Sequence, residues 1–279
     1  MNNKNKSIIA MLFSAFAFSL MGVFVKAIPE IPVIQKSLFR TATVMIIFLI
    51  FMRKEKVKIN SVNNHKLLII RSVLGTMGIL LNYYALDNLI LSDANVIFRL
   101  SSIFVVIFSW IFLKENVSKK EILPIIGAFI GVGMIIKPEF SFEMIPYLLA
   151  ILGAVFAAGA YTALRALGGK EHPTAIIFYF STFTTIVLLP FVAMNFISMN
   201  LKQISFAVLA GVCAAGGQLG ITLAYKYAPA KEVSIFNYFG VVFSAVFSIF
   251  VFGNIPDFLS VLGYIVVFGM AFYSYKLKR

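Results

Sequence analysis

The stretch Leu91–Leu113 reads LSDANVIFRLSSIFVVIFSWIFL, and a single arginine, Arg99, interrupts its apolar run. An apolar helix of about 20 residues spans the hydrocarbon core of a bilayer, so this stretch predicts a membrane-spanning helix. Moved along the chain by a constant offset, it falls on a stretch that includes residues 231–252, KEVSIFNYFGVVFSAVFSIFVF. The matching pairs are Asp93 and Glu232, Phe104 and Phe243, Phe108 and Phe247, and Ser109 and Ser248. The difference in residue number is the same for every pair, and this constant difference is called the repeat shift below. The chain therefore holds two copies of one membrane-spanning pattern.

The whole chain has the composition of a membrane protein. Of its 279 residues, 61% are hydrophobic and 13% are charged, and the mean hydropathy is +0.95. A soluble domain of this length needs a polar surface that this composition cannot supply. We expect an all-α polytopic membrane protein with ten transmembrane helices joined by short connections. The predicted spans are residues 7–28, 34–52, 66–86, 91–113, 120–137, 144–167, 173–195, 203–226, 231–252 and 257–276.

The basic residues predict the orientation. Most of the 24 Lys and Arg residues fall in alternate connections on the side of the two termini. The basic residues in connections on the other side are Lys26, Lys36, Lys137 and Lys202. The positive-inside rule then predicts a multi-pass protein of the cell (plasma) membrane with both termini in the cytoplasm. The net charge of +13 is explained by this topology and by anionic lipid, so no nucleic-acid partner is expected.

The repeat extends over both halves of the chain. Gly78 matches Gly217 at the same repeat shift, and further glycines match after a short deletion. We expect two five-helix repeats, residues 1–139 and residues 140–279. Because five is odd, the second repeat enters the membrane from the opposite side. Inverted repeats of this kind are typical of secondary transporters that bind their substrate between the halves and work by alternating access.

Several segments resemble the drug/metabolite transporter superfamily, specifically its EamA-type ten-span carriers. The segments that carry the resemblance are YALDNL at 84–89, SDAN at 92–95, FLKE at 112–115, the stretch from Gly127 to Pro138, and AYKYAP at 224–229. The resemblance covers essentially the whole chain and implies a carrier of metabolites, without specifying which. The fourth-span proline common in such carriers is absent at Ser102, and the matching position is Val241.

Arg99 is the strongest candidate for substrate binding. It lies about 12 Å from the start of its span at ~1.5 Å per residue, which is too deep for easy contact with lipid headgroups. Asn95, Arg99 and Ser102 are spaced i, i+4 and i+7 and so share one helix face. Every acidic residue falls in a loop or at a span end. We therefore expect carbonyls, hydroxyls, water or a ligand anion to meet the charge of Arg99.

Two more arginines lie within spans and are interpreted differently. Arg40 is about 9 Å deep, and both a cavity role and snorkelling or packing stay open. Arg71 is one turn from the start of its span, which favours a side chain that reaches lipid phosphates. The repeat shift places Tyr179 opposite Arg40 and Tyr238 opposite Arg99.

The remaining candidates are polar or aromatic side chains within spans. Together with Arg40, Asn95, Arg99 and Ser102, the predicted substrate-binding set contains Asn82, Tyr83, Tyr161, Tyr179, Gln218, Thr222, Asn237 and Tyr238. Interhelical hydrogen bonding is the alternative explanation for each polar residue. Tyr161, Tyr225 and Tyr238 are the best candidates for an aromatic cage around an organic cation.

These features predict a secondary transporter of a small metabolite, with an anionic or zwitterionic, amino-acid-like solute favoured. A carrier of organic cations or drugs is the alternative within the class, and a membrane-embedded lipid-modifying enzyme is the alternative outside it. Both histidines, His65 and His172, fall in loops, and no motif for catalysis, metal binding or phosphate binding occurs. We expect no enzymatic activity, no catalytic residue, no metal and no cofactor. The expected partners are the solute and the lipid bilayer, with the chain a monomer or homodimer. Since no acid or histidine is expected inside a span, no proton relay is expected either.

Overall fold

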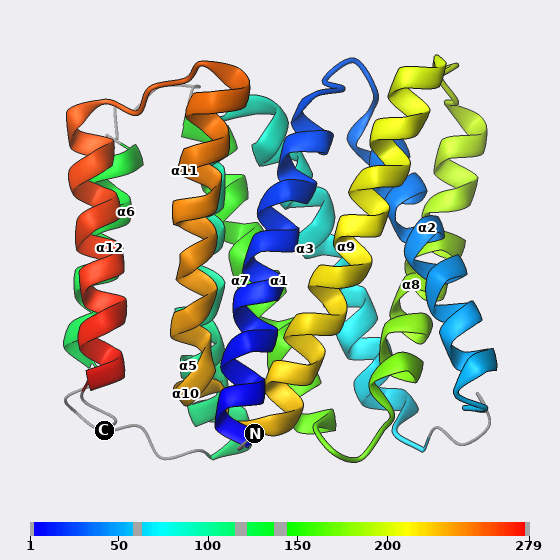
Figure 1. The fold of residues 1–279 in the computed structure, drawn as a ribbon, viewed down its shortest axis with the longest axis horizontal. Coiled ribbons are helices and arrows are strands. Elements are labelled where there is room, and N and C mark those ends of the chain that lie inside the picture. The colour runs from blue at the N-terminus through cyan, green and yellow to red at the C-terminus, as the bar shows by residue number, and fades with distance from the viewer. Residues whose placement is uncertain (1–2, 58–62, 115–121, 137–143, 277–279) are drawn as a thin grey trace.

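A computed structural model describes residues 3–57, 63–114, 122–136 and 144–276, and this part of the chain is all helical (Figure 1). The helices of the first half are α1 (Asn3–Lys26), α2 (Val33–Lys54), α3 (His65–Asn88), α4 (Leu91–Phe98), α5 (Leu100–Leu113) and α6 (Ile122–Ile136). Those of the second half are α7 (Ile145–Leu167), α8 (Pro173–Met194), α9 (Leu201–Tyr227), α10 (Ala230–Val233), the 3-10 helix η4 (Ser234–Tyr238), α11 (Phe239–Phe252) and α12 (Phe258–Lys276).

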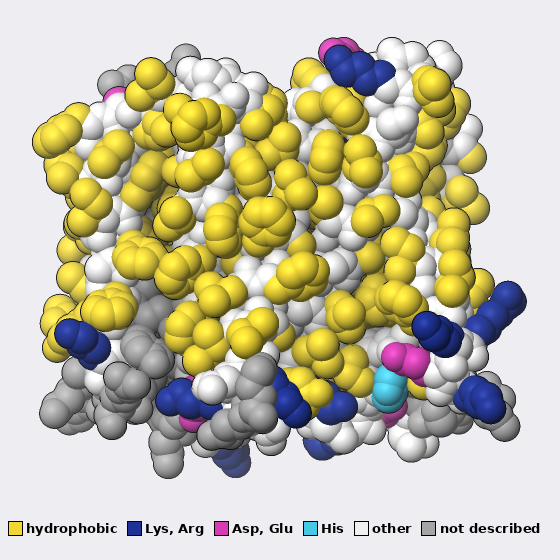
Figure 2. Space-filling model, in the orientation of Figure 1, with side chains coloured by type: hydrophobic (Ala, Val, Ile, Leu, Met, Phe, Trp, Pro, Cys, Tyr) yellow, Lys and Arg dark blue, Asp and Glu magenta, His cyan; other side chains and the backbone are white. Residues whose placement is uncertain are grey.

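The helices have the length and surface of membrane spans. Among the described residues, seven are long and apolar enough to cross a bilayer when α4 and α5 are taken together. Shorter apolar helices, α6, α11 and α12, occupy the fifth, ninth and tenth predicted spans. Figure 2 shows hydrophobic side chains over the middle of the molecule, with most Lys and Arg gathered at the end where both termini lie. The prediction of an all-α polytopic membrane protein is confirmed.

Local sequence signals explain where several helices begin. At the start of α9, the side chain of Asn200 accepts a hydrogen bond from the backbone N–H of Gln203, and the Gln203 side chain accepts one from the backbone N–H of Asn200, both at 2.9 Å. This reciprocal pair satisfies two N–H groups that a helix start leaves without partners. Proline begins α8 at Pro173, where its missing N–H costs nothing.

The packing of the helices has the symmetry of an inverted repeat. The chain rises in α1 and descends in α7, its counterpart in the second half (Figure 1). The helix α1 packs against α9, and α3 packs against α7, which is the same pair with the halves exchanged. The helices α2 and α8 pack against each other, as do α6 and α12, so each of these pairs is its own counterpart. Each half therefore contributes helices to every part of the bundle, and the predicted inverted repeats are confirmed. The expected boundary between residues 139 and 140 lies outside the described residues.

Close contacts between helices obey the repeat shift. A side chain on Gly78 would begin 3.1 Å from the backbone N of Ala157, and one on Gly217 would begin 2.8 Å from the ring of Phe18. The repeat shift relates the two glycines, and it also relates Phe18 to Ala157. Small residues allow helices in a membrane to approach closely, so these glycines set the spacing of α3 with α7 and of α9 with α1.

The fourth and ninth spans are each interrupted at matching positions. The α-helix breaks at Arg99 between α4 and α5, and a 3-10 segment ends at Tyr238 before α11. At the first break, the backbone N–H of Arg99 is shared between the carbonyls of Asn95 and Val96, at 3.1 and 3.0 Å. A tightened turn of this kind interrupts a helix without a proline, and it lies three residues before Ser102, where the expected proline is absent.

The two ends of the bundle are tied differently. At the end away from the termini, the ammonium of Lys36 on α2 binds the carboxylate of Asp87 on α3 at 2.5 and 2.6 Å. At the end with the termini, the carboxylate of Glu171 accepts hydrogen bonds from the backbone N–H groups of Asn63 and Asn64, at 2.9 and 3.0 Å. One end is thus joined by an ion pair and the other by hydrogen bonds from a loop.

Candidate functional site

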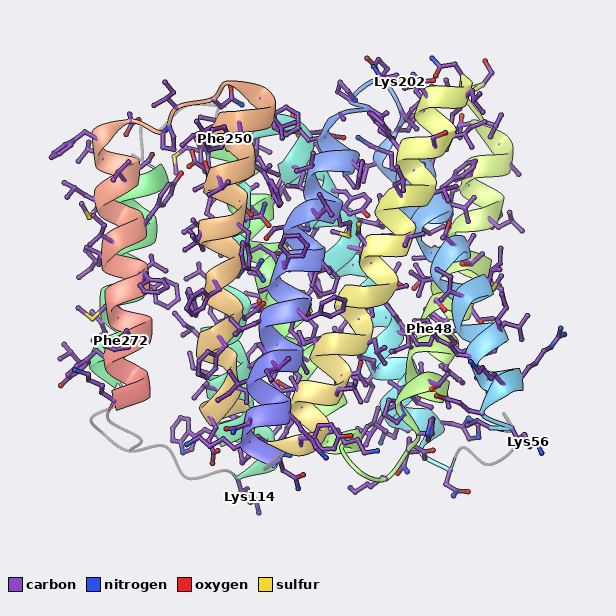
Figure 3. All side chains as sticks on the ribbon, viewed as in Figure 1. Phe48, Lys56, Lys114, Lys202, Phe250 and Phe272 are labelled. Atoms are coloured by element: carbon purple, nitrogen blue, oxygen red, sulfur yellow. The ribbon has the colours of Figure 1, made fainter. Side chains whose placement is uncertain are left out.

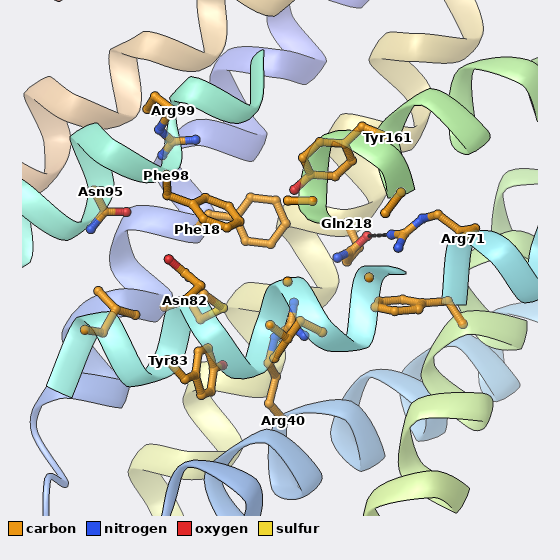
Figure 4. A pocket seen from close by; sticks show the side chains of 18 residues that line it. Phe18, Arg40, Arg71, Asn82, Tyr83, Asn95, Phe98, Arg99, Tyr161 and Gln218 are labelled. Carbon is orange, nitrogen blue, oxygen red and sulfur yellow. Dashed lines mark hydrogen bonds between the residues drawn. The ribbon is translucent and has the colours of Figure 1, made fainter. Parts of the chain in front are cut away.

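A cavity lies between the two halves of the bundle, lined by residues of helices α1 to α4 and α7 to α9 and by Arg99 at the junction of α4 and α5 (Figure 4). Its volume is about 50 Å³, whereas pockets for small ligands usually measure about 300–1,000 Å³. The cavity in this conformation is therefore too small for a metabolite and must widen to admit one. The predicted substrate-binding residues that line it are Arg40, Asn82, Tyr83, Asn95, Arg99, Tyr161 and Gln218.

Arg99 lies at the helix break and is 3% exposed. Its guanidinium donates to the side-chain oxygen of Asn237 at 2.6 Å, and the Asn237 amide donates to the hydroxyl of Ser102 at 3.2 Å. Gly240 makes room for the guanidinium, because a side chain there would overlap its terminal nitrogen. Three predicted residues therefore form one network, in which Arg99 lines the cavity and Asn237 and Ser102 lie behind it.

Arg71 also faces the cavity, so the prediction that it reaches lipid phosphates is wrong. It is 3% exposed, donates to the side-chain oxygen of Gln218 at 3.0 Å, and stacks 4.0 Å from the ring centre of Phe180. Gly75 leaves space for both groups, since a side chain there would overlap the guanidinium and lie 2.7 Å from the Phe180 ring. Packing by α8 and α9 directs Arg71 inward, although its depth in the span would allow it to reach the lipid surface.

Arg40 brings a third guanidinium to the same cavity. It is buried on α2, and its charge lies 5.9 Å from the centre of the Tyr83 ring. Of the two interpretations that its depth left open, the structure has the cavity position. Figure 4 shows the three arginines pointing toward the cavity from different sides.

The cavity is strongly positive. Among its described lining residues there is no Asp or Glu, and the Nε atoms of Arg40, Arg71 and Arg99 have no hydrogen-bond partner in the described part of the chain. The phenol-bearing side chain of Tyr161 lines the same cavity. Buried charges are costly unless they are paired, so this arrangement favours an anion between the arginines.

The other predicted residues do not line the cavity. Tyr179 lies in a separate groove with Met52 and faces the ring of His65 at 6.2 Å. Thr222, Tyr225 and Tyr238 are buried, and the Tyr225 ring centre is 6.1 Å from that of Tyr161. Of the three tyrosines proposed for a cation cage, Tyr161 is the one at the cavity wall, so they do not surround it.

Sequence reasoning missed several cavity residues besides Arg71. Besides two glycines, the apolar ones are Phe18, Met21, Ile79, Leu86, Phe98, Ala157, Ala160 and Phe180, and no chemical pattern distinguishes them from other core residues. The repeat contains a usable signal, however. The repeat shift carries Phe18 onto Ala157 and Ile79 onto Gln218, and all four line the cavity. The signal is partial, because Tyr179 and Tyr238, which the repeat shift places opposite Arg40 and Arg99, do not line the cavity.

One acidic side chain at a span end is buried. Asp93, in the first turn of α4, is 4% exposed and accepts a hydrogen bond from the hydroxyl of Tyr264 at 2.6 Å. Asp93 therefore lies at a span end, as expected of the acidic residues, and Tyr264 of α12 covers it there. In the described part of the chain, no three His, Cys, Asp or Glu side chains group as a metal site would require.

Comparison with known proteins shows which family, relatives and solved structures this chain resembles. The model of the EamA-like transporter family matches residues 5–137 and again residues 144–275. The chain is 29% identical to the pseudopaline exporter CntI of Pseudomonas aeruginosa, over 92% of this chain and 91% of that protein. It is 30% identical to human solute carrier family 35 member G1, over 92% of this chain and 75% of that protein. A solved crystal structure superposes with a TM-score of 0.81 over 99% of both chains at 12% identity, which shows the fold alone.

Proposed function

Because this chain belongs to the EamA-like transporter family, we propose that its central cavity carries a small anionic or zwitterionic metabolite across the membrane by alternating access. The observation that carries this proposal is the meeting of three buried guanidinium groups in one cavity whose described lining holds no carboxylate. A carboxylate of the solute would supply the missing counter-charge. Two of the relatives have names that describe transport of solutes, one of them an exporter.

Electrostatics decide between an anion and an organic cation. At an effective dielectric constant of about 20, a cation at about 4 Å from one guanidinium is repelled by about 4 kcal/mol. A cation–π contact with a tyrosine returns about 0.5–2 kcal/mol. Arg40, Arg71 and Arg99 would each add repulsion, whereas Tyr83 and Tyr161 are the tyrosines that line the cavity. Repulsion therefore exceeds attraction, and the cavity is unsuited to a cation.

Alternating access follows from the symmetry of the bundle. The narrow cavity lies between two halves with the same packing in opposite orientations. If the halves exchange their conformations, the route that was closed on one side opens and the other closes. We propose that the two moving units are the repeats at residues 1–139 and 140–279. We place the protein in the cell membrane with both termini in the cytoplasm, since basic side chains gather at that end (Figure 2).

Binding to arginine variants tests the anion proposal. Purified protein is screened by thermal shift against L-glutamate, L-alanine, acetate and choline, because a ligand that binds the native state raises its Tm. We expect at least one anion or zwitterion to raise Tm, and Arg99→Gln to weaken its binding by about 2–5 kcal/mol, as for removal of one partner of a buried charge pair. Arg99→Lys keeps the charge but loses two-point geometry, so binding should weaken less.

Arg53→Gln is the matched control, since Arg53 is exposed at the end of α2. It should leave binding unchanged. Unaltered anion affinity in Arg99→Gln, or choline binding that improves in that variant, would contradict the proposal.

A further inference from the structure

The number of positive charges in the cavity, and not only their sign, restricts the solute that the cavity can bind. Arg40 comes from α2, Arg71 from α3, and Arg99 from the junction of α4 and α5. Each is 3% exposed. All three line the same cavity as Tyr161. The groups therefore share one low-dielectric space, where three unit charges of the same sign raise the energy of the folded protein.

The protein groups that contact these guanidinium groups are neutral. Arg71 donates to the amide oxygen of Gln218 and stacks on a phenylalanine ring, and Arg99 donates to the amide oxygen of Asn237. A guanidinium has five N–H donors, and the Nε donor of every one of the three is unmatched within the described residues. The amides orient the arginines but leave the charge uncompensated.

A ligand with one carboxylate would neutralise one of these charges and leave two buried. Leaving a buried charge without its partner is strongly destabilising, so each further carboxylate on the ligand gains binding energy from an arginine that is already positioned. The guanidinium groups point inward from different sides (Figure 4), and a ligand with a single carboxylate carries one negative charge for three arginines. A branched ligand with three carboxylates offers one to each arginine.

We propose that the substrate class is a branched organic polyanion with three carboxylates, held by Arg40, Arg71 and Arg99. This inference rests on the proposed function, because it narrows the solute that the same cavity carries. The ligand would hold the arginines together, and Tyr161 and Gln218 would donate to the same carboxylates. The narrow cavity must widen as the polyanion enters.

Three probes that differ by one carboxylate each test the count. Propane-1,2,3-tricarboxylate, glutarate and butyrate are titrated onto the purified full chain at pH 7 by calorimetry. Each carboxylate forms a hydrogen bond to a charged group, so removal of each one should weaken binding by about tenfold or more. L-alanine is the zwitterionic probe and should bind no better than butyrate.

Arginine variants then test which carboxylate meets which group. Arg71→Gln should weaken the tricarboxylate by about tenfold or more and bring it near the affinity of glutarate for the wild-type protein. The losses of affinity from removing the arginine and from removing the carboxylate should not add, since both changes remove the same contact. Arg53→Gln, with its exposed side chain, should leave all three affinities unchanged.

The possible failures can be distinguished. If butyrate or L-alanine binds as tightly as the tricarboxylate, the polyanion proposal is overturned while the anion carrier stands. If no anion binds wild-type protein that shows a cooperative melting transition, the proposed function fails as well. Should Arg71→Gln not fold, Arg71→Lys and Arg40→Lys take its place, because each keeps the charge but loses two-point geometry. If both lysine variants select the tricarboxylate over glutarate as strongly as the wild-type protein does, the three-point contact is overturned.

Discussion

Two glycines decide whether the arginines can reach the cavity. Gly240 faces the guanidinium of Arg99, and Gly75 faces that of Arg71. Both positions lie in helices, where glycine is less favourable than alanine by about 1 kcal/mol. The cost is offset by the room that a missing side chain leaves for a planar cation. At the scale of single residues, the site depends on the lack of a side chain at these glycines as well as on the arginines themselves.

Gly240→Ala should therefore weaken binding more than it changes stability. The added methyl would overlap the guanidinium and displace it from Asn237, a bond of 2.6 Å. A displaced guanidinium would lose its hydrogen bond to the carboxylate of the solute, which predicts a binding loss of about 1.5–3 kcal/mol. Because the overlap falls on the end of a side chain, Tm should shift little, and calorimetry with thermal melting measures both.

Gly133→Ala is the control for this substitution. Gly133 lies in α6, and a side chain there meets nothing within 4 Å. It should be neutral or slightly stabilising through helix propensity. Equal loss of affinity in both variants would show that Gly240 has no special relation to Arg99.

At the scale of helices, one ion pair joins α2 to α3 at the end away from the termini. The side chain of Lys36 is 1% exposed and that of Asp87 is 14% exposed. Lys26, at the end of α1, donates to the carbonyls of Leu86 and Leu89 at 3.0 and 2.7 Å. Two lysines thus converge on the end of α3, and Asp87 is the carboxylate that balances them.

Asp87→Asn should destabilise the folded protein by about 3–5 kcal/mol, because it leaves the buried ammonium of Lys36 without a counter-charge. Replacing the pair together, as Lys36→Met with Asp87→Leu, should recover most of that loss, since both charges are gone. Unfolding in detergent, followed by intrinsic fluorescence, measures the difference. The exposed Lys202 supplies the control, and Lys202→Met should change stability by less than about 0.5 kcal/mol. A double variant as unstable as Asp87→Asn would indicate that packing, and not charge, explains the loss.

At the scale of the whole molecule, the two repeats are interleaved. The pairs α1 with α9 and α3 with α7 each join one helix from either half. The repeat shift relates the helix breaks at Arg99 and Tyr238, and it also relates the left-handed helix ends at Lys114 and Gly253, with φ of 55° and 67°. An interface shared this evenly is the arrangement that the proposed exchange of conformations between the halves requires.

The orientation of the bundle can be tested with single cysteines after Cys213→Ala. Lys170→Cys lies between α7 and α8 at the end of the termini, and Lys202→Cys lies at the opposite end (Figure 3). An impermeant maleimide on intact cells should label the second and spare the first, which should react once the cells are opened. The reverse pattern would invert the orientation, and labelling of both in intact cells would mean that the two sites share one face.

The sequence by itself determined the fold class, the spans and the repeat. Helix length and apolar composition are local properties, and a bilayer admits few structures other than helices. The repeat shift is likewise readable without coordinates, and it relates the contacts of Gly78 and Gly217. The place of Arg99 at the cavity could be predicted for the same reason, because its depth along one span already excluded contact with lipid headgroups.

Only the tertiary structure decided which polar side chains meet. Arg71 and Tyr179 lie at similar distances from the ends of their spans, yet Arg71 enters the cavity and Tyr179 does not. Depth along a helix follows from the sequence, but the direction of a side chain around the helix axis depends on which neighbours pack there. Gln218 and Phe180, far from Arg71 in the chain, are the neighbours that hold it inward. The number of charges in the cavity therefore emerges only when helices from both halves are assembled.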